Sequence, residues 1–439
     1  MGDFDVIVIG GGPAGEHCAD RLSEAGKRVA IVERELLGGE CDFWACIPSK
    51  TLLRPGEALA AARAAPGAAE AATGNLDPRG AFGWRDYMVS DYDDSGQAAW
   101  AKSAGIELLR GKGRVAGPGR VDVDGTEHSA EHVVLATGSD PVIPPVDGLR
   151  ELDGVWANRE ITALNDVPRS VLVLGAGPVG VETAQALKRL GSEEVTVIEG
   201  SDHVLPREAR QLGDALDEAL RAEGIVLHFG QHATAARRDG DDYVLEFGGG
   251  ALRGERLAVA TGRRPRTDGL GVDVGEHGEV AVDDRMSAGE NLWAIGDCCG
   301  IWPLTYMGKY QGRVAAANIL GRERHADYTA VPRVVFTDPQ AAAVGDSDGE
   351  QTATISLTGV ARTATYMREY ETPGYLTLIS DGERLTGAHA LGPEAGEWLQ
   401  QATLAIRARV PLDVLADTIQ PFPTFSEAFL HALMELRGA

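Results

Sequence analysis

The order of apolar and polar positions along the chain predicts two copies of one folding unit. Each copy consists of an apolar strand, a glycine-rich turn, a helical stretch and a second apolar strand, and short apolar runs bounded by glycine are typical of buried parallel strands. These segments are residues 5–9, 10–15, 16–22 and 29–32 in the first copy, and residues 171–174, 175–180, 181–190 and 195–198 in the second. Two βαβ units of this kind predict an α/β fold with two Rossmann-like domains.

The glycine spacing in both turns matches a dinucleotide-binding motif. Glycines at these places allow a tight turn, close approach of the backbone to a pyrophosphate and close packing of the helix. One such motif alone is weak evidence, but each copy follows a strand, opens a helix and ends in an acid that suits a ribose hydroxyl. The sequence therefore predicts two dinucleotide sites, formed by Gly10, Gly12, Gly15 and Glu33 in the first copy and by Gly175, Gly177, Gly180 and Glu199 in the second.

The pattern changes in the last part of the chain. Short strands are predicted at 375–380 and 385–391, and helices at 394–409 and 426–436, which together favour a separate α+β domain. A length of 439 residues suits about three domains. We predict the first dinucleotide domain in residues 1–150, the second in 151–267, a central segment that completes the first in 268–328, and the C-terminal domain in 329–439.

Composition narrows the set of partners. The formal charge of −25 and the isoelectric point of about 4.8 argue against binding of nucleic acid or anionic lipid over an extended surface, because both require clustered Lys and Arg. The first thirty residues predict neither a signal peptide nor a membrane span, so a cytoplasmic protein that acts on a small molecule is expected. Five cysteines in a chain of this length do not indicate a disulfide framework.

The most informative segment is Gly-Gly-Glu-Cys-Asp-Phe-Trp-Ala-Cys-Ile-Pro-Ser-Lys at residues 38–50. In a regular helix, residues five apart have Cα atoms about 8.6 Å apart, beyond the usual disulfide limit of about 6.8 Å. A bond between Cys41 and Cys46 therefore requires a distorted helix start, which Gly38 and Gly39 permit. A thiolate at a helix N-terminus has a lowered pKa. The alternatives are two reduced core thiols or half of a metal site, but no second Cys or His pair at ligand spacing accompanies them, so no metal is predicted.

With this motif, the chain resembles the flavoprotein disulfide reductases, the class I pyridine nucleotide-disulfide oxidoreductases that include dihydrolipoamide dehydrogenase and mercuric reductase. The resemblance covers almost the whole chain. Further family motifs follow in the family's order at Thr137-Gly138, Gly262-Arg263 and Gly296-Asp297, and residues 336–339 resemble the start of the family's dimerisation domain.

This resemblance implies an enzyme of EC 1.8.1 type that uses FAD and NADH or NADPH. It implies that Cys46 lies against the flavin while Cys41 exchanges with substrate, that Lys50 and Glu182 form an ion pair near the reactive edge of the flavin, and that Asp297 binds the ribityl chain. The other motif residues, Thr137, Gly138, Gly262, Arg263 and Gly296, are expected to bind cofactor. A homodimer with its active site at the subunit interface is expected, because the family's C-terminal segment reaches into the partner's site.

The chain departs from the family at one place. Most members have a His-Pro-Thr segment near the C-terminus, whose histidine is the acid-base group, and a glutamate five residues later. Here Phe422 occupies the histidine position and Glu427 keeps the glutamate. A phenyl ring cannot transfer a proton, so a loss of about 10²- to 10⁴-fold is expected for substrates that need this group.

Three interpretations remain open. The enzyme reduces a disulfide whose leaving thiol is acidic, or uses water or another residue such as His431 as the proton donor. Alternatively, it passes electrons from the flavin to a quinone, as a diaphorase does. In the third, it resembles 2-ketopropyl coenzyme M oxidoreductase/carboxylase, which has a Phe at this place but pairs it with His, unlike Glu427 here.

The remaining candidates concern nicotinamide choice and isolated side chains. Glu199 would bind a free ribose 2′-hydroxyl and repel a 2′-phosphate, which favours NADH over NADPH, although Arg207 and Arg210 lie nearby in sequence. His389 is expected to be structural. The other cysteines, Cys18, Cys298 and Cys299, are expected to be buried, inert thiols.

Overall fold

The computed structural model describes residues 2–367 and 374–438 and divides the chain into two compact units. The first unit comprises the residues up to Pro48, Gly83–Val142 and Gly262–Asp327; the second comprises Ser49–Phe82, Ile143–Thr261 and the described residues from Tyr328 on. Two of the places where the chain passes from one unit to the other lie inside helices, α3 (Cys46–Ala64) and α4 (Pro78–Met88). The sequence-based boundaries at 150, 267 and 328 stay predictions.

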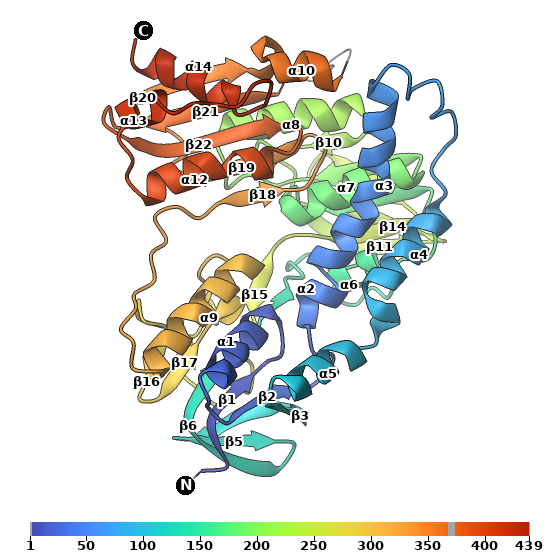
Figure 1. Ribbon diagram of the computed structural model, residues 1–439. Coiled ribbons are helices and arrows are strands. Elements are labelled where there is room, and N and C mark those ends of the chain that lie inside the picture. Colours follow the sequence, from blue (N-terminus) through green and yellow to red (C-terminus); the bar gives the residue numbers. More distant parts are fainter. Residues whose placement is uncertain (1, 368–373, 439) are drawn as a thin grey trace. The chain divides into compact units, whose positions relative to one another are not determined.

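The first unit is organised by a mixed sheet whose central strands are parallel, in the order β16-β17-β6-β1-β2-β3, with β5 joining β6 and β4 joining β5 (Figure 1). Its strands are β1 (Phe4–Ile9), β2 (Val29–Glu33), β3 (Ile106–Arg110), β4 (Gly113–Gly117), β5 (Arg120–Val123), β6 (Thr126–Leu135), β16 (Ser287–Gly289) and β17 (Leu292–Ala294), with β7 (Ser139–Pro141) pairing separately with β15 (Arg263–Pro265). Its helices are α1 (Pro13–Glu24), α2 (Gly39–Phe43), α5 (Ser95–Ser103) and α9 (Thr305–Ile319).

Small residues bring two helices of the first unit together. A Cβ atom added to Gly308 of α9 would lie 2.9 Å from the Cβ atom of Ala14 on α1. One added to Gly312 would lie 3.4 Å from the Cβ atom of Cys18. Because these positions carry no larger side chain, α9 packs closely on the helix that follows the first glycine turn.

The second unit contains a parallel sheet in the order β10-β9-β8-β14, a three-stranded antiparallel sheet β11-β12-β13 and a five-stranded antiparallel sheet β18-β19-β22-β21-β20 within the described residues (Figure 1). The strands are β8 (Ser170–Leu174), β9 (Glu194–Ile198), β10 (Val226–His228), β11 (Ala233–Asp239), β12 (Asp242–Phe247), β13 (Gly250–Gly254), β14 (Arg256–Val259), β18 (Arg333–Val335), β19 (Gln340–Gly345), β20 (Gln351–Ser356), β21 (Tyr375–Ser380) and β22 (Leu385–Gly392). The helices are α6 (Asn158–Thr162), α7 (Pro178–Leu190), α8 (Arg210–Ala222), α10 (Ala361–Tyr366), α11 (Ala395–Trp398), α12 (Gln400–Arg407), α13 (Leu412–Ala416) and α14 (Glu427–Leu436).

The predicted fold class is confirmed, and one helix differs from the prediction. Both βαβ openings form, and strands β21 and β22 lie where the sequence predicts them. The helix predicted at 394–409 is divided into α11 and α12, which meet at Leu399. Leu399 keeps α-helical dihedral angles and is buried, so the apolar periodicity continues through the junction and does not mark it.

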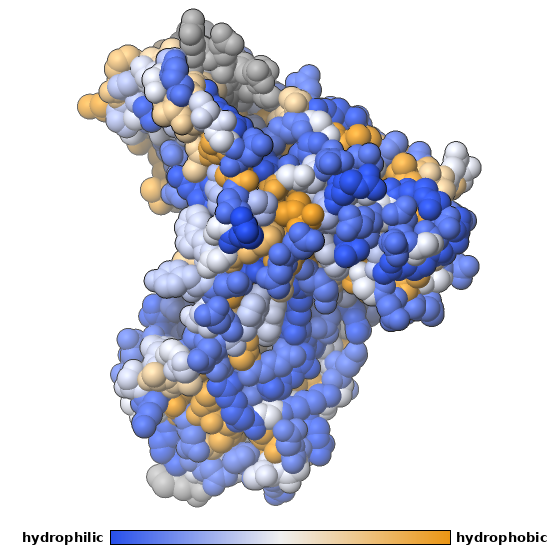
Figure 2. All heavy atoms as spheres, turned by 90° about the vertical axis from the view of Figure 1, so that its right-hand side faces the viewer, coloured by the Kyte–Doolittle hydropathy of each residue, from blue (hydrophilic) through white to orange (hydrophobic). Residues whose placement is uncertain are grey.

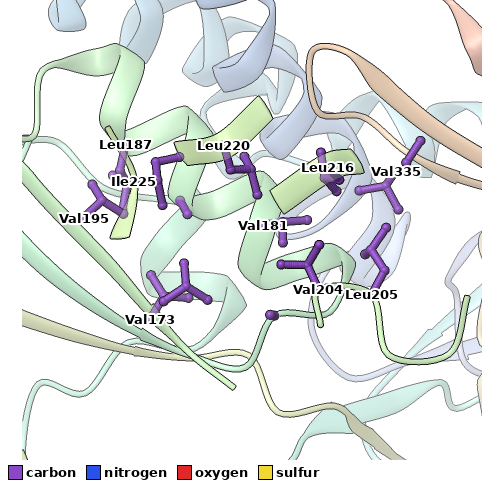
Figure 3. Packing of buried hydrophobic residues seen from close by; sticks show 14 of the residues in the cluster. Val173, Val181, Leu187, Val195, Val204, Leu205, Leu216, Leu220, Ile225 and Val335 are labelled. Atoms are coloured by element: carbon purple, nitrogen blue, oxygen red, sulfur yellow. The ribbon is translucent and has the colours of Figure 1, made fainter. Parts of the chain in front are cut away.

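One hydrophobic core joins the parallel and C-terminal sheets of the second unit. Figure 3 shows aliphatic side chains from β8, α7, β9 and α8 packed together, among them Val173, Val181 and Leu216, with Val335 of β18 in the same cluster. All four are almost fully buried. Burying an aliphatic side chain stabilises the fold by about 1.5–3 kcal/mol, so this continuous core fixes α7 relative to the start of the C-terminal domain.

On the face drawn in Figure 2, hydrophilic residues predominate and hydrophobic ones form small islands between them. In the described ranges, no helix has the length and apolar character that crossing a membrane requires.

Candidate active site

The first glycine turn has the geometry of a dinucleotide cradle. Gly10 has a φ of +111°, which favours glycine, and a Cβ atom added to Gly15 would overlap the carbonyl oxygen of Gly10. By contrast, a Cβ atom added to Gly12 meets no atom within 4 Å, so space is open at the N-terminus of α1, which has no side-chain cap. Helix N-termini of this kind bind pyrophosphate. Glu33, at the end of β2, accepts hydrogen bonds from the Gly11 N–H (2.8 Å) and the Glu35 N–H (2.7 Å).

The second turn repeats this geometry in the second unit. Gly175 has a φ of +107°, a Cβ atom on Gly180 would overlap the Gly175 carbonyl, and one on Gly177 meets nothing within 4 Å. Glu199 accepts hydrogen bonds at 2.8 Å from the N–H groups of Ala176 and Ser201. Both predicted glycine sets therefore form turns with room for a phosphate group above the helix N-terminus.

The residues of the first unit also fit the ribityl side of FAD. The carboxylate of Asp297 accepts a hydrogen bond of 2.5 Å from the Ser139 hydroxyl, and the Arg263 guanidinium donates to the hydroxyl and carbonyl oxygens of Ser139 at 2.7 Å. Ser139 thus connects two predicted residues, although no motif singled it out. The Thr137 hydroxyl donates to the Arg266 carbonyl at 2.6 Å.

Glycines flank this group of side chains. Gly138, Gly262 and Gly296 have φ values of +75°, +118° and +77°. An added Cβ atom meets nothing within 4 Å at Gly138 or Gly262. The Gly296 N–H donates to Gln311 at 2.7 Å. The open backbone at Gly138 and Gly262 leaves room for a cofactor, and hydroxyl donors on a ribityl chain suit the carboxylate of Asp297.

The two cysteines occupy neighbouring helices with a break between them. Cys41 lies in the short helix α2, Trp44 caps it with a φ of −136°, and Cys46 is the first residue of α3. The distorted helix start that the spacing requires is therefore present. Gly38, with a φ of +112°, and Gly39, with a φ of +61°, make the entry into α2. The structure holds both cysteines as thiols.

A threonine from a distant segment contacts both sulfur atoms. The Thr305 hydroxyl, in the first turn of α9, lies 3.3 Å from the Sγ atom of Cys41 and 3.3 Å from that of Cys46. The hydrogen bond with Cys46 and burial raise the pKa of the Cys41 thiol. Cys41 is therefore not the thiol that ionises first, while Cys46 lies at a helix N-terminus, where a thiolate is stabilised.

Two carboxyl groups were not predicted: Asp42, which follows Cys41, and Glu16, which lies within range of the charge of Asp42. Burial and the neighbouring charge of Asp42 raise the pKa of Glu16 to about 8, and burial raises the pKa of Asp42 as well. The Oε1 atom of Glu16 is buried without a hydrogen-bond partner. Lys309 of α9 partly offsets both effects through its charge.

In the second unit, Lys50 and Glu182 form an ion pair. The Lys50 Nζ atom donates to Glu182 Oε2 at 2.7 Å, and the Phe336 N–H donates to Glu182 Oε1 at 2.9 Å. The ammonium of Lys50 also lies 4.8 Å from the centre of the Phe336 ring, within the range of a cation–π contact. The carboxylate is 8% exposed and the lysine side chain 34% exposed, so only the lysine reaches solvent.

The C-terminal candidates lie before and at the start of α14. Phe422 is 73% exposed, and the Oε2 atom of Glu427, the first residue of α14, is buried without a hydrogen-bond partner. His431 is exposed, one turn after Glu427. His389 is buried, its Nδ1 atom lies 2.9 Å from the Tyr375 hydroxyl, and burial lowers its pKa to about 4, as suits a structural histidine.

The remaining predicted side chains have ordinary surroundings. Cys18, Cys298 and Cys299 are buried. Arg210 is exposed and pairs with Asp202 and Asp214. Among the described residues, His, Cys, Asp and Glu side chains form no group of three that could hold a metal ion.

Two dinucleotide turns, a cysteine pair at a helix start and a C-terminal antiparallel sheet define a class of protein, the flavin-dependent pyridine nucleotide oxidoreductases. The comparison with family models makes the assignment specific. The model described as pyridine nucleotide-disulphide oxidoreductase matches residues 4–316, and that of the dimerisation domain of the same family matches residues 331–433. The chain belongs to the pyridine nucleotide-disulphide oxidoreductase family. It is an FAD-dependent, NAD(P)H-using enzyme.

Known relatives agree with this assignment. The chain is 35% identical to a dihydrolipoyl dehydrogenase of Thermus scotoductus, over 98% of this chain and 97% of the relative, and 34% identical to a mercuric reductase of Acidithiobacillus ferrooxidans, over 97% and 81%. Among solved structures, LpdA of Mycobacterium tuberculosis has a TM-score of 0.86 at 26% identity, covering 98% of this chain and 99% of that one. The HOCl-induced flavoprotein disulfide reductase RclA of Escherichia coli has a TM-score of 0.85 at 25% identity, covering 98% and 99%.

Proposed function

We propose that this enzyme uses NADH to reduce a small disulfide through the Cys41–Cys46 pair, without the acid-base histidine that most of its family has. The observation that carries the proposal is the contact of the Thr305 hydroxyl with both sulfur atoms, at 3.3 Å each, where α3 begins. Bound FAD supplies the step from a hydride donor to a disulfide acceptor.

The cysteines perform the exchange with substrate. The Cys41 thiol loses its proton as its sulfur attacks one sulfur of the substrate disulfide, so that a mixed disulfide forms and one substrate thiolate leaves. Cys46 then attacks the Cys41 sulfur, which releases the second substrate thiolate and restores the Cys41–Cys46 disulfide. Two electrons from NADH reduce this disulfide for the next turnover, and the two leaving thiolates take up protons.

Phe422 determines which disulfides suit this enzyme. The site is proposed to be completed by Phe422 of the partner subunit in a homodimer, and the high exposure of this ring in one chain supports that role. Because a phenyl ring donates no proton, the leaving thiol must depart as a thiolate, which favours acidic thiols. Glu427, whose Oε2 atom is buried without a partner, follows the ring at the start of α14.

The proposed choice of NADH rests on Glu199. Its two carboxylate oxygens are held by the Ala176 and Ser201 N–H groups, which aim the carboxylate from the end of β9. A ribose with free hydroxyls can donate to this carboxylate, whereas a 2′-phosphate would be repelled. The ion pair of Lys50, on α3, with Glu182, on α7, is proposed to act beside the reactive edge of the flavin.

The test is a series of disulfides with leaving thiols of graded acidity, from 5,5′-dithiobis(2-nitrobenzoate) to lipoamide. In the unchanged enzyme we expect kcat/KM to fall steeply as the thiol pKa rises. Phe422→His should raise activity on lipoamide by about 10²-fold and flatten this dependence. Cys41→Ser serves as the control that must lose activity on every disulfide. A flat series in the unchanged enzyme, or full activity of Cys41→Ser, would contradict the proposal.

A further inference from the structure

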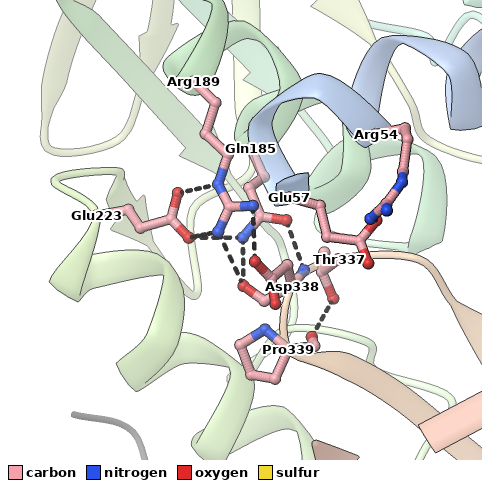
Figure 4. A network of polar contacts seen from close by, with 8 residues as sticks. All are labelled: Arg54, Glu57, Gln185, Arg189, Glu223, Thr337, Asp338 and Pro339. Atoms are coloured by element: carbon pink, nitrogen blue, oxygen red, sulfur yellow. Dashed lines mark hydrogen bonds and ion pairs between the residues drawn. The ribbon is translucent and has the colours of Figure 1, made fainter. Parts of the chain in front are cut away.

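One face of α7 holds the segment that leads into the C-terminal domain (Figure 4). Glu182 accepts from the Phe336 N–H at 2.9 Å, and one turn later Gln185 accepts from the Asp338 N–H and donates to the Asp338 carbonyl, both at 2.8 Å. Arg189, a further turn along, donates to the Asp338 carboxylate at 2.9 Å. Residues three or four apart on a helix share a face, so three successive turns of α7 hold this segment at two of its residues, Phe336 and Asp338.

Arg189 connects more elements than the other two. Its guanidinium donates twice to Glu223, just after α8, at 2.8 and 2.6 Å, as well as to Asp338. Its aliphatic stem lies against α3 at Gly56, where an added Cβ atom would be 2.7 Å from the arginine Cδ atom. Arg189 therefore contacts α3, the end of α8 and the segment before β19 at once.

Two of these elements carry the Lys50–Glu182 ion pair. Lys50 and Gly56 lie on the same helix, α3, and Glu182 and Arg189 lie on the same helix, α7. The pair also depends on Phe336, which donates its N–H to Glu182 and presents its ring to the Lys50 ammonium. The ion pair is thus held by α3, α7 and the segment from Phe336 to Asp338. Arg189 belongs to α7 and contacts the other two.

We propose that Arg189 is a positioning residue for the Lys50–Glu182 pair, and that it acts by holding α3 and the Phe336–Asp338 segment against α7. This inference rests on the proposed role of the pair beside the flavin. If the ion pair were displaced, the positive charge of Lys50 would lie in a different place relative to the flavin. Because the charge near a flavin sets its reduction potential, the potential would change.

The charges and hydrogen bonds around Arg189 favour one fixed position of its guanidinium. Its side chain is 15% exposed, and although burial alone would lower its pKa, the hydrogen bonds and charges of Glu223 and Asp338 raise the pKa above its ordinary value. Arginine forms such forked, planar contacts with carboxylates, which lysine does not reproduce. Gln185, fully buried, adds a hydrogen bond of 2.7 Å to the same Glu223 carboxylate.

The test is a double-mutant cycle on the FAD-loaded enzyme. Arg189→Leu and Lys50→Met are made singly and together, and three quantities are measured: the flavin reduction potential, the visible spectrum of the oxidised flavin, and the rate of anaerobic flavin reduction by NADH. We expect Lys50→Met and Arg189→Leu each to lower the potential and to slow reduction, by about 10-fold for Arg189→Leu. In the Lys50→Met background, Arg189→Leu should change the rate by less than about 2-fold, because residues that act through one another are not additive.

Three further variants make the result specific. Arg189→Lys keeps the charge without the fork and should lie between the unchanged enzyme and Arg189→Leu. Arg54→Leu removes an exposed arginine of α3 that pairs locally with Glu57, and should leave potential and spectrum unchanged. If Arg189→Leu fails to fold, Gly56→Ala displaces the arginine stem with every charge kept, and should shift the potential in the same direction.

The outcomes separate this inference from the proposed function. If Lys50→Met changes neither potential nor spectrum, the proposed place of the pair beside the flavin is wrong, and the inference is overturned with it. If Lys50→Met changes them but Arg189→Leu has the same effect in both backgrounds, Arg189 is only structural, while the proposed function stands.

Discussion

The glycine turns of the two units share the pattern Gly-x-Gly-Pro-x-Gly and nearly the same backbone, yet only one of them has a redox centre beside it. The φ values of Gly10 and Gly175 are +111° and +107°, and each turn has an acid that accepts a 2.8 Å hydrogen bond from the residue after the first glycine. That residue is Gly11 in the first turn and Ala176 in the second. The binding geometry is therefore common to both.

The neighbours of the turns differ. In the first unit, the Gly38 N–H donates to the Gly11 carbonyl at 2.7 Å, and a Cβ atom added to Gly39 would lie 2.8 Å from the Gly12 Cα atom. This close packing brings helix α2, with Cys41, onto the turn. In the second unit, Ala176 is buried and α8, without cysteines, follows. Dinucleotide binding and disulfide chemistry thus depend on separate sequence signals.

The largest effect is expected from Cys46→Ser, which removes one thiol of the redox pair in the first unit and leaves the second unit unchanged. Reduction of disulfides should fall by at least about 10³-fold, because a serine hydroxyl cannot replace a thiolate nucleophile. FAD content and the Kd for NADH should stay the same. The measurement is steady-state disulfide reduction together with NADH titration followed by fluorescence. A changed Kd for NADH would show that the two functions are not separable.

A matched pair of substitutions at the residue after the first glycine should affect the two turns differently. A Cβ atom on Gly11 would lie 2.6 Å from the Leu37 Cδ1 atom, so Gly11→Ala should destabilise the first unit by about 1–3 kcal/mol and weaken FAD retention. Ala176→Gly at the equivalent position should leave FAD retention unchanged. Thermal unfolding followed by flavin release measures both. Equal FAD loss in the two variants would contradict the proposed difference.

The smallest effect is expected from substitution of Glu33 and Glu199, the two acids that bind the glycine turns. Glu199→Gln should raise the KM for NADH about 10-fold, since a hydrogen bond to a charged group is worth about 1.5–3 kcal/mol, and should leave FAD binding unchanged. Glu33→Gln should do the reverse and weaken FAD binding by a similar factor. Steady-state kinetics and equilibrium dialysis of FAD distinguish them. If either variant affects both cofactors equally, the assignment of one turn to each cofactor is wrong.

The sequence predicts those features that depend on local patterns. The strand, turn and helix around Gly10 and Gly175 are contiguous, so periodicity and glycine spacing are sufficient. The broken helix between Cys41 and Cys46 follows from disulfide geometry and is present, with Trp44 at the break.

Contacts between segments that are far apart in the sequence were not predicted. Thr305 is far from the cysteines in sequence and belongs to no motif that was recognised, and Ser139 follows the Thr-Gly motif but carries no signal for its bonds to Asp297 and Arg263. The raised pKa of Glu16 depends on burial beside Asp42, which spacing along α1 cannot show. The grip of Arg189 on Asp338 likewise depends on how α7 packs, and a lone arginine near the end of a helix is usually solvated.

The central claim is that Cys46 ionises beside a bound flavin while Cys41 is available to substrate. Anaerobic titration of the FAD-loaded enzyme with NADH, followed in the visible spectrum, tests it most directly. Addition of two electrons should produce a long-wavelength absorbance band from the thiolate next to the flavin, and the Cys46→Ser variant should lack it. Bleaching of the flavin without this band in the unchanged enzyme would contradict the claim.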